Sequence, residues 1–418
     1  MLARGIAVCL ATLALSNATG PAQAQAPGIT LAEALRRAAE SNPDLRIARS
    51  DVSAAQGIAR GARRLAFNPE VSAELGRLQE SGGYRRSYAF GLSQRFELGG
   101  KRGSRIRAGD QHALAAEARL TRRGHEVAAR VTLAFSLAQI ARLRVATAKE
   151  AEQVAVQLKA AADDRLALGA GTQLEVNIAA AAASRERRAR LESERAYASA
   201  VFELASAMGL PAGEAPEPVG ELVVPIPEER PESVLVALAL ARRPDLQAAV
   251  AERDAANWSF RFARGLAWPD PALGANLIRE DIRLLSFGIS MPLPLLNQAQ
   301  VSRAEAQRFF EQASIAEEAL RRQVTREVQN AYQAYARARE AQSGFDREAV
   351  ERLSENLQLA EESFRAGKIG LLVFSTVRRD LVEARLSYLD ATADLIERRL
   401  ALALATGESL TERQPERE

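Results

Sequence analysis

The sequence has very few of the side chains that bind soft metals or act as nucleophiles. Its 418 residues include 1 Cys, 3 Met and 2 His. Cys9 lies in a predicted export signal, so the mature chain would have no disulfide, no thiolate metal site and no thiol nucleophile. His112 and His125 are thirteen positions apart, whereas two zinc ligands on one helix lie about four apart. We therefore expect no catalytic residue, no cofactor site and no metal site, and the chain is not predicted to be an enzyme.

Long apolar stretches and a strong charge of one sign are also missing. After residue 25 no stretch approaches the roughly eighteen apolar residues of a membrane-spanning helix. The net charge is only +3, and acidic and basic residues are interspersed, which argues against a nucleic-acid-binding patch. Aromatic residues make up only 5% of the chain while alanine is abundant, which favours long, closely packed helices over a thick globular core.

The first residues are typical of an export signal. Arg4 supplies a positive charge, residues 6–15 form a short apolar run, and a cleavage motif of small residues ends at Ala24. We predict a signal peptide at residues 1–24, with cleavage after Ala26 as the alternative.

The chain repeats itself after about two hundred residues. The motif Asn-Pro-Asp-Leu at 42–45 returns as Arg-Pro-Asp-Leu at 243–246, and Phe-Gly-Leu-Ser at 90–93 returns as Phe-Gly-Ile-Ser at 287–290. This period is far longer than the roughly 20 to 50 residues of a solenoid repeat. We predict two halves of one design at 25–210 and 232–407, a proline-rich linker at 211–231, and a charged, disordered tail at 408–418.

Each half is predicted to contain a helix, a hairpin of two strands, a very long helix, a glycine turn and a second long helix. In the first half these are a helix at 30–64 interrupted near 42–43, strands at 69–78 and 84–96, a helix at 103–168, a turn at 169–172 and a helix at 173–208. In the second half they are a helix at 232–266, strands at 272–279 and 284–292, a helix at 299–366, a turn at 367–370 and a helix at 371–406. The proline-free helix at 103–168 would be about 100 Å long, which no single-core domain needs.

The predicted strands alternate between two kinds of side chain, so that each hairpin has one apolar face. The apolar positions that we expect to face lipid are Tyr88, Phe90, Leu92, Phe287 and Ile289. Strands of this length match tilted membrane strands, but four strands cannot close a barrel, and a bilayer does not tolerate open edges. Chains would therefore share a barrel, with eight strands from two chains or twelve strands and a lumen from three. An ordinary soluble four-stranded sheet is the alternative, and it leaves the long helices unexplained.

Several of these segments together resemble a known family. The duplicated plan, the two Phe-Gly-Leu/Ile-Ser strands and the turns at Gly169 and Gly367 are similar to the TolC-like outer-membrane factor family of outer membrane efflux proteins. The segments Phe-Glu-Leu-Gly-Gly-Lys-Arg at 96–102 and Met-Pro-Leu-Pro-Leu-Leu-Asn at 291–297 resemble the outer-membrane component of cobalt-zinc-cadmium type cation efflux systems.

The resemblance implies a mainly α fold with a small β part. Three chains would form a homotrimer, in which four strands per chain build a 12-stranded outer-membrane β-barrel that continues into a periplasmic α-helical tunnel. The helices after the hairpins would be continuous, and those after the turns would be built of two stacked segments. The implied partners are a periplasmic adaptor protein, an inner-membrane efflux pump of the resistance-nodulation-division type and outer-membrane lipid.

The two turns are the strongest candidates for a functional site. In the family such turns form the periplasmic tip, which closes the tunnel and meets the adaptor. The matching residues are Gly169, Gly171, Thr172, Leu174, Gly367, Gly370 and Leu372. Repeated by symmetry, Asp163, Asp164 and Glu175 beside the first turn would form an acidic aperture that favours cations, and ordinary solvated helix ends are the alternative. Some family members carry aspartates shortly after the second turn, where this chain has Val373 and Thr376.

The expected function is a passive exit duct in the outer membrane, with a large periplasmic portion, that exports heavy-metal cations. The alternatives are a duct of the same fold for drugs or for type I protein secretion, and a soluble periplasmic coiled-coil scaffold. The alternating strand faces argue against the scaffold, because a scaffold needs no lipid-facing band.

Overall fold

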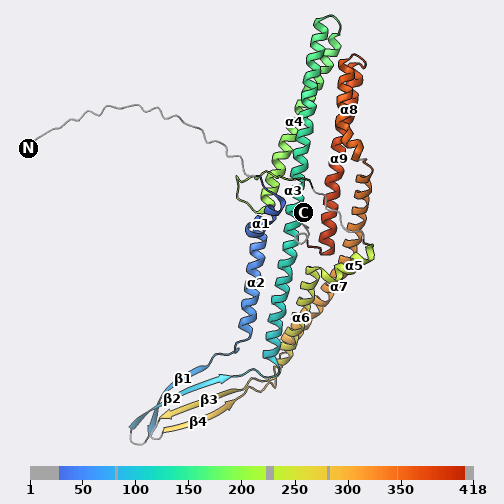
Figure 1. Cartoon of the computed structure of the whole chain (residues 1–418). Coiled ribbons are helices and arrows are strands. Elements are labelled where there is room, and N and C mark those ends of the chain that lie inside the picture. The colour runs from blue at the N-terminus through green and yellow to red at the C-terminus, as the bar shows by residue number, and fades with distance from the viewer. Residues whose placement is uncertain (1–27, 81–82, 223–229, 280–282, 346, 410–418) are drawn as a thin grey trace, which may run out of the picture.

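The molecule is a long bundle of helices with a small sheet at one end (Figure 1). The structure is a computed structural model that describes residues 28–80, 83–222, 230–279, 283–345 and 347–409. The predicted signal peptide lies outside the described residues, as do parts of the first hairpin turn (81–82), the linker (223–229) and the tail (410–418).

The two halves of the chain contain the same elements in nearly the same order. The first half consists of α1 (Leu31–Ser41), α2 (Pro43–Ala62), β1 (Glu70–Glu80), β2 (Gly83–Arg95), α3 (Lys101–Ala167) and α4 (Gln173–Met208). The second half consists of α5 (Glu232–Arg242), α6 (Pro244–Gly265), β3 (Ala272–Arg279), β4 (Arg283–Ser290), α7 (Gln300–Ser343), α8 (Arg347–Arg365) and α9 (Leu371–Thr406). The predicted mainly α fold with four strands is confirmed.

Two helices of the second half are shorter than predicted. The single helix expected at 232–266 is divided into α5 and α6 at Arg243, whose extended backbone (φ −62°, ψ 122°) is the conformation that a following proline imposes. The single helix expected at 299–366 is divided into α7 and α8 near Gly344. Glycine is a weak helix former, and the ring of the next residue, Phe345, packs edge-on against Tyr388 of α9 with centroids 6.0 Å apart.

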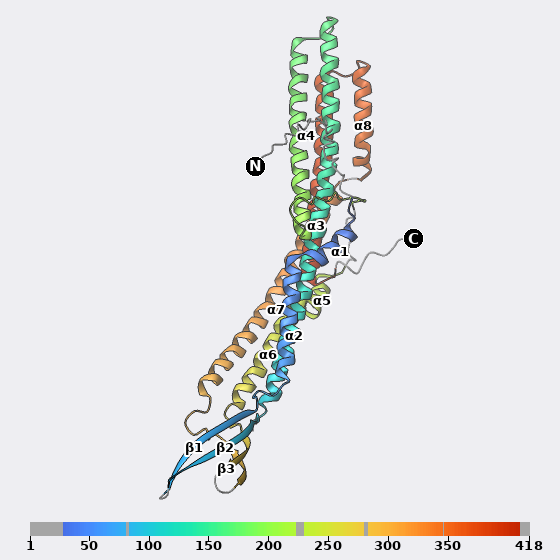
Figure 2. The same cartoon turned by 90° about the vertical axis from the view of Figure 1, so that its left-hand side faces the viewer.

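The expectation of continuous helices after the hairpins therefore holds for α3, which has 67 residues, and is wrong for α7. The expectation of two stacked segments after each turn is also wrong, since α4 and α9 are continuous helices of 36 residues each. The α3–α4 pair extends further from the sheet than the α8–α9 pair does (Figure 2).

In the first half, α4 ends against the junction between α1 and α2. Its last turn is closed by Gly209, whose φ of 76° is left-handed. The buried Asn42 lies against this glycine, and its Nδ2 donates a hydrogen bond to the carbonyl oxygen of Ala207 at 2.9 Å. Its Oδ1 accepts a hydrogen bond from the backbone N–H of Asp44 at 2.9 Å. One amide side chain therefore caps α2 and holds the end of α4.

In the second half, Arg243 replaces this asparagine at the equivalent junction. Its buried guanidinium forms ion pairs with Asp245 at 2.6 Å and Glu327 at 2.5 Å, and donates to the carbonyl oxygen of Ala405 near the end of α9. Burial disfavours the charged forms of Arg243 and Asp245, but their hydrogen bonds and the attraction between opposite charges outweigh this effect. They raise the pKa of Arg243 and lower the pKa of Asp245. A buried ion network thus holds α9 where an amide holds α4.

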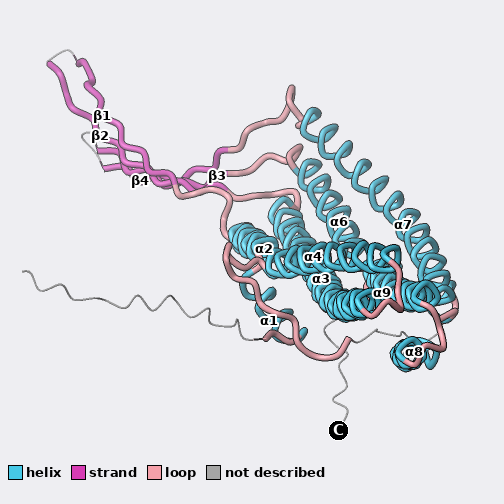
Figure 3. The backbone as a smooth tube through the Cα atoms, turned by 90° about the horizontal axis from the view of Figure 1, so that it is seen from above, coloured by secondary structure: helices cyan, strands magenta, loops and turns pink. Residues whose placement is uncertain are grey.

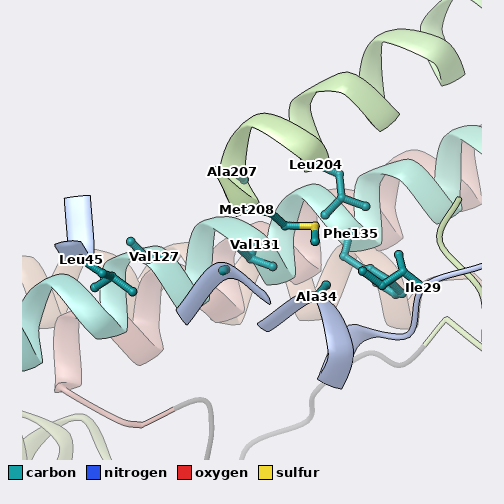
Figure 4. Packing of buried hydrophobic residues seen from close by; sticks show 10 residues of the cluster. Ile29, Ala34, Leu45, Val127, Val131, Phe135, Leu204, Ala207 and Met208 are labelled. Carbon is teal, nitrogen blue, oxygen red and sulfur yellow. The ribbon is translucent and has the colours of Figure 1, made fainter. Parts of the chain in front are cut away.

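Apolar contacts around the first junction bring α1, α3 and α4 together (Figure 4). Phe135 of α3 packs with Leu204 and Met208 of α4, and all three side chains are buried. Ile29 covers this cluster, and its backbone pairs with the segment after α4. Ile29 N–H donates to Glu217 O at 2.8 Å, and Val219 N–H donates to Ile29 O at 2.9 Å. The start of the first half is therefore tied to the segment that follows its last helix.

The four strands form one antiparallel sheet in the order β1-β2-β3-β4, which lies apart from the helices when the molecule is seen from above (Figure 3). Across the sheet, Ala73 pairs with Phe90, Phe90 with Leu277, and Leu277 with Leu285. Because side chains alternate between the two faces of a strand, this register puts most of the apolar residues of the four strands on one face.

Candidate functional site

One face of the sheet is apolar and uncovered. The structure places all five residues predicted to face lipid on this face. Phe90 is 54% exposed and Phe287 is 79% exposed. No helix in the described part of the chain is both long enough and apolar enough to cross a bilayer. The apolar side chains on this face of the sheet, such as Phe90 and Phe287, are thus exposed in a single chain.

The other face of the sheet carries mostly small and polar side chains, apart from Ile278 and Leu284 next to the second hairpin turn. Gly91 of β2 lies between Ser72 of β1 and Asn276 of β3, and a Cβ at this glycine would come within 2.4 Å of Ser72 Oγ and 2.5 Å of Asn276 Oδ1. The same face carries Glu74 and Ser286, opposite Ala89 and Asn276 respectively. A sheet with one apolar face and one polar face suits a boundary between an apolar phase and water.

The first distal turn, between α3 and α4, is set by glycine and by a capping box. Gly169 has a left-handed φ of 69°. Thr172 Oγ1 accepts a hydrogen bond from the backbone N–H of Glu175 at 3.3 Å, and a Glu175 carboxylate oxygen accepts one from the backbone N–H of Thr172 at 3.0 Å. Leu168 and Leu174, at 83% and 67% exposure, leave an apolar surface at the turn.

The structure brings the three acidic candidates to this same end of the molecule, but two of them already have partners. Asp163 accepts a hydrogen bond from the Lys159 ammonium at 2.7 Å, one helical turn away. Glu175 is held by the capping box described above. Asp164 is exposed, so it is the carboxylate of this group most accessible to ions from solution.

The second distal turn, between α8 and α9, is held against α3 by apolar contacts. Gly367 has a left-handed φ of 71°, whereas Gly370 is extended, with φ −81° and ψ 162°. Phe364 and Phe374 on either side of the turn stack with ring centroids 5.3 Å apart, and Leu158 of α3 belongs to the same cluster. Beyond the turn, Leu372 is 71% exposed. At the end of the molecule opposite the sheet, the first turn therefore presents two exposed leucines, Leu168 and Leu174, and the second presents Leu372.

Sequence reasoning missed a buried arginine close to the second turn. Arg378 of α9 is 2% exposed, and it donates to the carbonyl oxygen of Ala151 on α3 at 2.7 Å and to Glu186 on α4 at 2.9 Å. It lies four positions after Phe374, so the spacing of apolar residues on α9 puts it on the buried side. It connects the second turn to both long helices of the first half.

Both histidines lie on α3, thirteen positions apart. His112 of α3 lines a groove beside α2, where burial and the charge of Arg119 lower the pKa of its imidazole. Within the described ranges, no group of three or more His, Cys, Asp or Glu side chains is close enough together to hold a metal ion.

Known proteins with similar sequences or structures are channels and resistance proteins. The cobalt-zinc-cadmium resistance protein CzcC of Cupriavidus metallidurans is 27% identical over 372 residues, which cover 88% of this chain and 87% of CzcC. The nickel-cobalt-cadmium resistance protein NccC of Alcaligenes xylosoxydans xylosoxydans is 32% identical over 148 residues, which cover 34% of this chain and 33% of NccC. The solved outer-membrane channel OprN has the same fold, with a TM-score of 0.75 and 20% identity, and the match covers 91% of this chain and 90% of OprN.

The sequence also matches a family, the one described as outer membrane efflux protein. The match has two parts, at residues 34–210 and 235–408, and each part contains one hairpin and one distal turn. Together they span most of the chain, and they include the sheet and both turns. The chain therefore belongs to the outer membrane efflux protein family.

Proposed function

We propose that this chain is the outer-membrane exit duct of a tripartite efflux system that exports heavy-metal cations. The observation that carries the proposal is the sheet, which has an uncovered apolar face, a polar face and two open edges, and which is attached to a helix of 67 residues. A single chain cannot satisfy these strand edges in lipid, where each unpaired backbone group costs several kcal/mol.

A homotrimer of this chain would pair the strand edges that a single chain leaves open. Twelve strands would close a barrel wide enough for a lumen, with the phenylalanines of the apolar face in lipid and the glycines and serines of the polar face in water. The signal peptide predicted at 1–24 would direct the chain out of the cytoplasm. The helices that the structure describes all lie on one side of the sheet (Figures 1 and 2), so they would extend together into the periplasm.

The distal turns would then be the periplasmic tip that meets the adaptor. Their exposed leucines, Leu174 and Leu372, offer apolar contacts, and the tight turns at Gly169 and Gly367 set their positions. Asp163, Asp164 and Glu175 would give the aperture a weakly acidic character, to which Asp164 would contribute most. The energy for export would come from an inner-membrane pump.

We expect Gly367→Val to abolish metal resistance while the amount of assembled protein in the membrane stays normal. Valine is β-branched and strongly disfavours the left-handed φ of 71° found at this position, so the second turn would change its shape. The matched control is Gly367→Asn, because asparagine tolerates a left-handed φ and no atom lies within 4 Å of a Cβ placed at this position. Metal resistance would be measured as growth in graded metal concentrations. Normal resistance in Gly367→Val would remove the second turn from the mechanism.

The cargo assignment rests on the similarity to CzcC, the cobalt-zinc-cadmium resistance protein, together with the scarcity of metal ligands. With 2 His, 3 Met and 1 Cys, the chain has few soft or imidazole ligands to retain a metal ion. An ion must bind only weakly inside a conduit, because a tightly bound ion would not leave the conduit. Selectivity would therefore lie in the pump, and this chain would supply a wide passage.

We expect deletion of the gene to increase sensitivity to zinc, cobalt or cadmium in a strain that has no second duct to substitute. The purified protein should show no tight metal site by calorimetry, and the double variant His112→Ala with His125→Ala should keep full resistance. Full metal tolerance of the deletion strain, together with new sensitivity to detergents or dyes, would instead assign the duct to drugs.

A further inference from the structure

A pocket of about 410 Å³ lies where α5, α7 and α9 meet. This volume is within the roughly 300–1,000 Å³ that small-molecule sites occupy. The residues that line it include three arginines and two tyrosines, namely Arg230, Arg339, Arg399, Tyr332 and Tyr335. The pocket therefore combines positive charge with aromatic surface.

The internal repeat shows which part of the first half corresponds to this pocket. In the first half, Val127 and Val131 of α3 pack against the end of α4. In the second half, Val324 and Val328 of α7 pack against the end of α9. In addition, α4 and α9 both have 36 residues and end at a left-handed glycine, so they align end to end. The pocket thus occupies the place of the apolar cluster that joins α1, α3 and α4.

Two buried apolar residues of the first half correspond to arginines in the second half. Ile29 directly precedes the cap of α1 and covers the apolar cluster (Figure 4), and the residue in the same place before α5 is Arg230. Val201 of α4 is buried, and its counterpart on α9 is Arg399. Apolar side chains therefore fill this place in the first half, whereas guanidinium groups line a pocket in the second.

Arg399 is buried with few acceptors around it. It is 4% exposed, and its Nη2 donates to a carboxylate oxygen of Glu408 at 2.9 Å. Its Nε is also buried, and no atom of the described residues accepts a hydrogen bond from it. A buried N–H group without an acceptor is costly, so this guanidinium favours a further acceptor. Among the described residues that line the pocket, Glu408 is the one acid beside three arginines, which leaves an excess of positive charge.

We propose that this pocket binds a small organic anion, with a carboxylate or phosphate group on an aromatic or aliphatic body. The planar guanidinium groups of Arg399 and Arg230 match the oxygens of such an acid group. The rings of Tyr332 and Tyr335 and the side chain of Leu402 offer contacts to the apolar body. The excess of positive charge disfavours metal cations, so this site is separate from the route of the proposed cargo.

Calorimetric titration of the full chain in a nonionic detergent tests the proposal with three probes: hydrocinnamate, its neutral amide and phenyl phosphate. We expect one site per chain for at least one of the two anions, and the tighter of the two identifies the acid group. The amide should bind roughly tenfold more weakly than hydrocinnamate or worse, because it lacks the charge that the arginines recognise. Equal binding of hydrocinnamate and its amide would overturn the proposal. If neither anion binds the full chain, the proposal is wrong, and recovery of binding in a variant that ends at Ser409 would assign the pocket to residues 410–418 instead.

Two variants replace pocket arginines with their apolar counterparts from the first half. Arg399→Val and Arg230→Ile should each weaken binding of the anion by roughly tenfold or more. Arg230 is only half-buried, so its variant tests the site even if Arg399→Val fails to fold. The matched control is Arg398→Val, at the next position of α9, where the arginine pairs with Asp394 at 3.0 Å instead of lining the pocket. Unchanged binding in both pocket variants, or an equal loss in the control, would show that these arginines do not hold the anion.

Discussion

Phe287→Arg is expected to remove the protein from the outer membrane, whereas Ser286→Arg should leave it there. Phe287 is 79% exposed on the apolar face of β4, and Ser286 is its neighbour on the opposite face. An arginine on the lipid face of a membrane strand costs about 2–4 kcal/mol near the midplane of the bilayer. A trimer would bear this cost three times, which is enough to prevent assembly.

Membrane fractionation and the amount of heat-labile trimer on gels would measure this effect. Phe90→Arg and Ser87→Arg on β2 provide a second matched pair, in a strand that is paired on both sides. If substitutions on the two faces reduce the trimer equally, the apolar face of the sheet does not face lipid.

The second large effect is expected at the junction between α4 and α2, where Gly209→Ala should destabilise the helical part strongly. An alanine with a left-handed φ costs about 1–2 kcal/mol. In addition, its Cβ would come within 2.7 Å of the Cα of Asn42, and such overpacking costs about 1–3 kcal/mol more. The backbone of Asn42 cannot move freely, because its side chain caps α2 and holds the end of α4.

Gly169→Ala is the matched control for this prediction. Gly169 has a similar φ of 69°, but no atom lies within 4 Å of a Cβ placed there, so only the backbone cost applies. Thermal unfolding followed by far-ultraviolet circular dichroism would compare the two variants. Equal losses of stability would contradict the close approach of Gly209 to Asn42.

The sequence predicted best those elements whose ends are set by local residues. The helices at 173–208 and 371–406 have the bounds that the sequence predicts, and in the structure left-handed glycines follow both and a capping box begins the first. The division between α5 and α6 was missed, although the same Pro-Asp-Leu motif marks a break in the first half. The division at Gly344 depends partly on the contact of Phe345 with Tyr388, which no local pattern reveals.

The candidate site also contains features that local sequence patterns predict and one that they cannot predict. Strand alternation was enough to place the apolar and polar faces, because the period of a strand is two and the register preserves it. Arg378 could not be found in this way, since its partners Ala151 and Glu186 lie on α3 and α4, roughly two hundred residues earlier in the chain. Local patterns give the faces of single elements, whereas a buried charge depends on elements that meet only in the folded molecule.

The open edges of the sheet also have a consequence for the life of a single chain before it assembles. Unpaired strand edges beside an exposed apolar surface are templates for aggregation. In the proposed trimer, productive pairing with two other copies would compete with disordered association, and both would become faster as the concentration of unassembled chains rises. The newly exported chain would therefore need to be kept dilute or shielded until it reaches the membrane, and its yield in refolding would depend on when detergent or lipid is added.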